Sequence, residues 1–195
     1  MRRLMLVMLG LVLLALGGGG HEHARADDLQ SFVQASRAKV KTFAQGLQGA
    51  LQAAIKEGGP SNAIEVCNVE APEIAGELSA DPDWTVARTS HKLRNPGNAA
   101  DRWEVAVLDE FLARAAGGED LKTMEKAELV MSGGARSYRY MKAIPVGEVC
   151  LTCHGAEIDA GLQAQIKAFY PEDRATGFSL GELRGAFTIT KAVPD

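Results

Sequence analysis

Two cysteines and a histidine fall within five consecutive residues, Cys150-Leu151-Thr152-Cys153-His154. The spacing C-x-x-C-H is typical of covalent haem attachment of the c type. Two thiols about one helical turn apart can each bond to one vinyl group of the same porphyrin, and the histidine that follows is then placed to bind the iron. This motif constrains the fold more than any other feature, because the rest of the chain must enclose one haem held at Cys150 and Cys153.

Three other interpretations of the motif are weaker. A thioredoxin-like redox pair would follow a strand, begin a long helix and have no need of His154. A zinc site would need four ligands, and the third cysteine, Cys67, is far from the spacing of a zinc finger. A structural disulfide would leave one cysteine over in an oxidising compartment.

The first 26 residues have the pattern of a cleavable export signal. Arg2 and Arg3 precede an apolar run, Leu4 to Leu16, and Ala24-Arg25-Ala26 suits a signal peptidase. The run is short for a membrane span, which needs about 20 residues, although a retained N-terminal anchor is the alternative. The sequence therefore predicts a signal peptide over residues 1–26, a periplasmic domain over residues 27–195 and no stable membrane span after cleavage. Export agrees with the motif, since c-type haem attachment takes place outside the bacterial cytoplasm.

The charge balance argues against one class of partner. The formal net charge is −4 for the whole chain, and loss of three arginines and one glutamate with the signal peptide makes it −6. A mildly acidic surface is not that of a protein that binds nucleic acid.

Hydrophobic patterning predicts helices first and then strands interleaved with helices, which indicates a small α+β domain with an antiparallel sheet. The long helix over residues 29–56 ends at Gly58-Gly59-Pro60, and Ser61 is the expected N-cap of the next helix, with a restart or kink near Pro72. The other expected elements are strands over residues 84–89, 128–132, 138–144 and 185–193 and helices over residues 103–115 and 162–169. The strands over residues 128–132 and 138–144 are expected to form a hairpin across Ser132-Gly133-Gly134.

The second axial ligand of the iron is not determined by residue type. Cys67 is a lone thiol in an exported chain, so its presence needs a reason. It either packs in a helix face or binds iron as a thiolate, which would favour the ferric state and a low reduction potential. The competing ligands are His91, on a segment that leads into a loop, and the methionines Met124, Met131 and Met141, of which the last two are expected to pack in strands.

Four motifs in order carry a resemblance that covers almost the whole mature chain. They are Gly58-Gly59-Pro60 with Ala63 to Cys67 and Ala71 to Ala75; Arg88 to Asn98 running to Trp103-Glu104; Cys150 to Gly155; and Tyr170-Pro171 with Ala175-Thr176-Gly177 and Gly181 to Ala186. With these motifs the chain resembles the single-haem c-type cytochromes with a PAS-like fold.

The resemblance implies an α+β, PAS-like antiparallel sheet with flanking helices and a long N-terminal helix, around one covalently bound haem. It also implies His/Cys axial ligation, in which the distal cysteine corresponds to Cys67. One departure is visible: Ala100 stands where the family usually has proline before Asp101, which would make the loop less rigid.

Arg88, Lys92 and Arg94 form a basic cluster beside the loop. Guanidinium pairs well with carboxylate, so Arg88 and Arg94 are predicted to hold haem propionates, against the alternative of a solvated strand edge. The run Tyr138-Arg139-Tyr140 could line the haem pocket. Alternating aromatic residues in a strand more often pack in the core or lie on the surface.

These features predict a periplasmic protein with one covalent haem c, acting in electron transfer or as a redox or gas sensor. Its partners would be a redox or signalling protein and, in the sensor case, a diatomic gas. The alternative is a haem enzyme of peroxidase type with an open distal site, in which His91 would serve as the polar base.

Overall fold

The computed structural model describes residues 19–194, with side chains from residue 27 onward. Residues 1–18, which hold the apolar part of the predicted signal peptide, lie outside the described residues, and cleavage after Ala26 stays a prediction. Within the described range, none of the helices combines the length and apolar character that a membrane span requires. The helices and strands, in order, are α1 (Gly19–Gly58), α2 (Pro60–Glu65), η1 (Val66–Glu70), α3 (Ala71–Leu78), β1 (Trp84–Thr89), η2 (Pro96–Asn98), α4 (Arg102–Ala116), β2 (Glu125–Ser132), β3 (Ala135–Pro145), α5 (Glu148–His154), α6 (Ala160–Phe169) and β4 (Leu183–Val193).

The four strands form one antiparallel sheet in the order β1-β4-β3-β2. The predicted hairpin joins β2 and β3 through Gly133 and Gly134, both at positive φ (58° and 87°). Two central residues at positive φ suit the right-handed twist of the flanking strands, and glycine takes that conformation without strain. The helices expected over residues 29–56, 103–115 and 162–169 are present; each begins one to ten residues earlier than expected and ends within two residues of the expected end.

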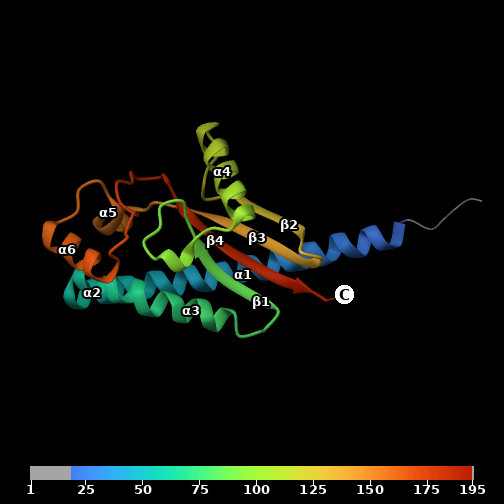
Figure 1. Ribbon diagram of the computed structural model, residues 1–195, viewed down its shortest axis with the longest axis horizontal. Helices are drawn as coiled ribbons and strands as arrows, with labels where there is room; N and C mark the ends of the chain where they lie inside the picture. Colours follow the sequence, from blue (N-terminus) through green and yellow to red (C-terminus); the bar gives the residue numbers. More distant parts are fainter. Residues whose placement is uncertain (1–18, 195) are drawn as a thin grey trace, which may run out of the picture.

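Helices cover both faces of the sheet (Figure 1). Tyr138 and Tyr140 of β3 and Ile189 of β4 pack against Phe32 and Phe43 of α1 in one core. The alternate residues of the same strands turn to the opposite face and form the second core with α4, through Met141, Ala143, Ala186, Leu108 and Phe111. This division follows from the two-residue period of a strand, and it gives the predicted α+β, PAS-like fold.

The segment after α1 corrects one expectation. Ser61 is not an N-cap: Gly59 is the cap and Pro60 occupies the first helical turn, where a missing N–H costs nothing. The helix then passes through one π-helical turn, η1, in which the N–H of Ala71 donates to the carbonyl of Val66, five residues back. Pro72 cannot donate to the carbonyl four residues earlier, so the irregularity expected there is a change of hydrogen-bond register rather than a break. Cys67 lies in this turn.

One end of the molecule is built differently from the two cores. There α2, η1 and the C-terminal half of α1 face α5 and α6 across the end of the sheet (Figure 1). The loop after β1 and the start of β4 complete the enclosure. This end holds all three cysteines.

Candidate haem site

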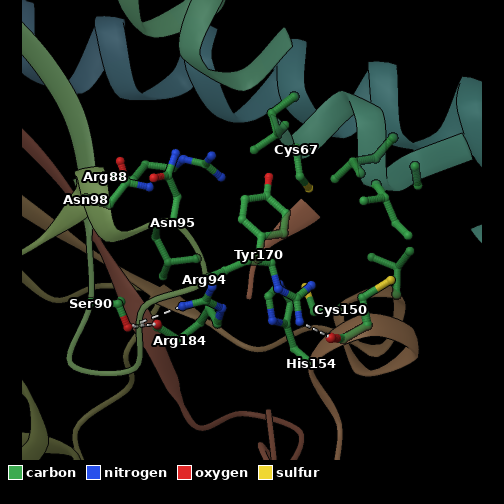
Figure 2. Close-up of a pocket in the computed structure, with 18 of the residues that line it drawn as sticks. Cys67, Arg88, Ser90, Arg94, Asn95, Asn98, Cys150, His154, Tyr170 and Arg184 are labelled. Atoms are coloured by element: carbon green, nitrogen blue, oxygen red, sulfur yellow. Dashed lines mark hydrogen bonds between the residues drawn. The ribbon is translucent and has the colours of Figure 1, made fainter. Parts of the chain in front are cut away.

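The space between these elements is a pocket, called the main pocket below. The space free of protein atoms inside it, including the part open to solvent, is about 1240 Å³. Concave, mostly apolar pockets with a few polar groups are where proteins generally bind cofactors. The wall formed by α1 and α2 is largely apolar, and the other walls carry sulfur, imidazole, phenol and guanidinium groups. The residues central to the site are Cys67, Arg88, Ser90, Arg94, Cys150, Cys153, His154, Tyr170 and Arg184. All of them except Cys153 are labelled in Figure 2.

The C-x-x-C-H segment lies in α5, which is separated from the end of β3 by two residues and ends at His154. His154 Nδ1 lies 2.6 Å from the carbonyl oxygen of Ala175. A carbonyl only accepts, so Nδ1 carries the proton and Nε2 keeps its lone pair. Burial, reinforced by Arg184 and Arg94, lowers the pKa of His154 to about 2. The imidazole is therefore neutral and oriented through its second nitrogen, as metal-binding histidines generally are.

A buried ion pair supports this arrangement. Arg94 donates from Nε and Nη2 to the two carboxylate oxygens of Asp173 at 3.2 and 3.1 Å, and both side chains are only 9% exposed. The same Nη2 donates to the backbone carbonyls of Cys153 and Ala175, while Asp173 accepts from the N–H of Ala175 at 2.9 Å. Arg94 thus ties the C-x-x-C-H segment, called the haem segment below, to the loop that orients His154. The propionate role expected of Arg94 stays a prediction, but its guanidinium already has a carboxylate partner.

Cys67 faces the main pocket from η1, across from the wall that carries His154 (Figure 2). Burial raises the pKa of its thiol, and the nearby positive charges of Arg88, Arg94 and Arg184 act in the opposite direction. It is a free cysteine. A thiol in this place can approach a metal bound at His154 from the other side.

The competing axial ligands lie elsewhere. His91 lines a second pocket, beside α4, and its Nε2 is 3.0 Å from a carboxylate oxygen of Asp109. Met124 and Met141 are fully buried in the α4 core. Met131, expected to pack, is instead 66% exposed because β2 is an edge strand. None of the four lines the main pocket, and His91 is not placed to act as a distal base.

The basic cluster divides into residues with different surroundings. Arg88 lines the main pocket and, among the described residues, has no carboxylate within ion-pair distance. Burial lowers its pKa. Lys92 turns away, with its ammonium 4.6 Å from the centre of the Phe178 ring. Tyr138 and Tyr140 pack under α1 and do not wall this pocket.

Several residues that line the pocket had no role predicted from the sequence. Arg184, at the start of β4, donates from Nη1 to the hydroxyl of Ser90 and to the carbonyl of Lys92, each at 3.2 Å, and burial lowers its pKa to about 10. Tyr170 closes α6 and is 5% exposed. Both lie in segments that carry the family resemblance, which was the available signal. The apolar residues Leu47, Leu51 and Ile55 of α1 also line the pocket. Their helical spacing in the sequence predicted only that they share one apolar face of the helix.

The geometry bears on the alternative interpretations of the motif. A thioredoxin-like pair would begin a long helix, whereas α5 has seven residues and ends at the histidine. In the described part of the chain, no three His, Cys, Asp or Glu side chains are grouped as a metal-ion site would require. All three cysteines are unpaired with one another.

The fold and the site define a class: a PAS-like α+β domain in which a C-x-x-C-H helix forms one wall of a largely apolar pocket. The chain belongs to the Tll0287-like family, whose model matches residues 22–192. Its structure is similar to the crystal structure of the cyanobacterial haem-protein Tll0287, with a TM-score of 0.61 and 26% sequence identity, over 87% of this chain and 96% of that one. No curated protein matches the sequence.

Proposed function

We propose that this chain is an exported c-type cytochrome with one haem, bound covalently through Cys150 and Cys153 and ligated by His154 and Cys67. The observation that carries the proposal is the placement of Cys67 and the His154 imidazole on opposing walls of one pocket, beside the two motif cysteines. The haem-protein relative, matched over nearly all of its length, supports the same cofactor.

The residues present fit such a group. The His154 imidazole is neutral and held through Nδ1, which leaves Nε2 for a metal. The apolar side chains of α1 suit a porphyrin face, and Arg88 and Arg184 supply positive charge without a carboxylate partner among the described residues. We assign the propionates to these two arginines in place of Arg94, because Asp173 already neutralises Arg94.

The haem would supply a one-electron couple of low potential, since thiolate and imidazole together favour the ferric state. Ligands on both faces leave no open position for a substrate, which favours electron transfer or redox sensing over peroxidase chemistry. A gas sensor would require one ligand to leave on reduction. The signal-like residues 1–26 support a periplasmic location, where the partner would be a redox or signalling protein.

The proposal is tested by a redox titration of protein made in a host that matures c-type cytochromes. We expect one reversible one-electron couple at low potential and a ferric spectrum of thiolate-ligated, low-spin haem. Carbon monoxide added to the reduced protein separates the two roles: an unchanged spectrum indicates an electron carrier, and a shifted one indicates a gas-binding sensor. A high-spin ferric spectrum would contradict the proposal and favour the enzyme.

Replacing Arg88 with glutamine is expected to lower the reduction potential. The guanidinium charge stabilises the reduced haem, which carries one positive charge fewer than the oxidised haem. The expected change is on the order of tenfold in the redox equilibrium, about 59 mV for one electron. Arg136→Gln, on the hairpin outside the pocket, is the control. Equal potentials for the two variants would remove Arg88 from the propionate site.

A further inference from the structure

The two outer strands of the sheet, β1 and β2, differ in how their free edges are covered (Figure 1). The edge of β1 faces the end of α3, where the N–H of Val86 donates to the hydroxyl of Ser79 at 2.8 Å. The edge of β2 has no hydrogen-bond partner among the described residues. An uncovered edge is a template for another strand, and proteins generally shorten it, break it with proline or a bulge, or cover it. β2 has eight residues, contains no proline and pairs with β3 without a bulge.

The charged side chains in the middle of β2 are engaged within the chain. Lys126 pairs with Glu110 of α4 at 2.9 Å, and Glu128 accepts from the indole N–H of Trp103. Charged side chains often protect an edge strand, but these two are held against α4. They therefore leave the path of an incoming strand open.

The opposite face of β2 carries an exposed apolar strip, which consists of Ala127, Leu129 and Met131. Leu129 is 39% exposed and Met131 is 66% exposed. Ala127 packs at the margin of the α1 core, and Leu129 lies directly opposite Tyr138, a member of that core. The strip thus continues the core beneath α1 out to the open edge, where none of the described residues covers it.

The strip is self-complementary about Leu129. A two-fold axis at this residue pairs residues 126–132 of two antiparallel copies, with Leu129 opposite itself and Ala127 opposite Met131 of the second copy. Backbone N–H and C=O groups face alternate sides along a strand. An axis at a residue therefore brings the outward-facing groups of one copy to those of the other.

The charges favour this register over its neighbours. Lys126 then lies opposite Ser132, and Glu128 lies opposite Val130, so no like charges meet. An axis one residue earlier would place Glu128 opposite itself, which is destabilising. An axis one residue later would run the pairing into the turn that follows Ser132.

We propose that the open edge of β2 is a dimer interface, where a second copy of this chain adds its own β2 antiparallel about Leu129. The pairing joins two four-stranded sheets into one. It satisfies the backbone groups of the open edge and covers the exposed side chains of Leu129 and Met131. No residue of β2 lines the main pocket, so the inference stands apart from the proposed function.

The register is tested by single cysteines in the holoprotein. Leu129→Cys places a thiol opposite its own copy, where directly paired Cα atoms are about 4.5–5.5 Å apart, within reach of a disulfide. Met131→Cys is the matched control: it is more exposed, but its copies are offset by about four residues, on the order of 13 Å. Mild oxidation is expected to cross-link most of the Leu129→Cys protein and to leave Met131→Cys, like the wild type, as single chains on a non-reducing gel. A gel on which both variants cross-link equally, or on which neither does, would overturn the inference.

Sedimentation of the holoprotein measures the same interface without a cross-link. The wild type is expected to be a dimer, and Met131→Lys, which places a charge in the apolar strip, is expected to lose it. Leu180→Lys is the control, because Leu180 is 58% exposed but lines the second pocket, away from β2. A monomeric wild type, or a Met131→Lys protein that dimerises as well as Leu180→Lys, would contradict the proposal.

Discussion

Replacing Cys67 with serine is expected to abolish the thiolate spectrum of the ferric protein and to raise its reduction potential. Serine has nearly the shape of cysteine but is a poor ligand for haem iron. Loss of the thiolate removes negative charge that stabilises ferric iron. The rise is expected on the order of 0.1 V or more, within the range of about 0.8 V that axial ligands span.

The matched variant is His91→Ala, which removes the competing ligand suggested by the sequence. His91 lies in the second pocket with Asp109, so its removal is expected to leave both the spectrum and the potential unchanged. The two variants together decide between the ligands. A normal spectrum in Cys67→Ser, or a changed one in His91→Ala, would contradict the assignment.

The second large effect is on stability. Replacing Arg94 with methionine leaves the carboxylate of Asp173, 9% exposed, without its charged partner. Removing one member of a buried ion pair generally costs about 3–5 kcal/mol. The haem segment also loses a donor to the carbonyl of Cys153. We expect the midpoint of urea unfolding of the holoprotein to fall sharply.

The control for Arg94→Met is Arg37→Met. Arg37 pairs with Glu125, but its side chain is 48% exposed. An exposed pair contributes about 0–1 kcal/mol, so this variant should unfold close to the wild type. If the two variants lost the same stability, the network around Asp173 would not be what holds the haem segment.

The arrangement of helices and strands was largely predictable because it follows from local signals. The strand over residues 84–89 has the predicted bounds, and Gly133-Gly134 makes the predicted hairpin. The predictions for Ser61 and Met131 were wrong because a neighbouring residue, or the place of the strand in the sheet, mattered more than the local sequence pattern. Pro60 took the first helical position that Ser61 was expected to cap, and Met131 fell on an edge strand with no layer over it.

The site could be predicted only where residues that are close together in the sequence are also close together in the structure. Cys150, Cys153 and His154 share one short helix, so their motif predicts their proximity. Arg184 and Tyr170 reach the pocket from separate elements, and only the tertiary fold brings them beside Cys67. Likewise, the apolar period of α1 could not distinguish Leu51, which lines the pocket, from Phe43, which packs on the sheet. The partner of Arg94, Asp173, is 79 residues away.

The central claim, one haem bonded to Cys150 and Cys153, is tested most directly by the intact mass of the denatured protein. The sample comes from a host able to mature c-type cytochromes and is separated under denaturing conditions. The account predicts that the Soret absorbance elutes with the chain and that the chain mass is increased by one haem. Haem that elutes apart from the chain, with free thiols at both cysteines, would contradict it.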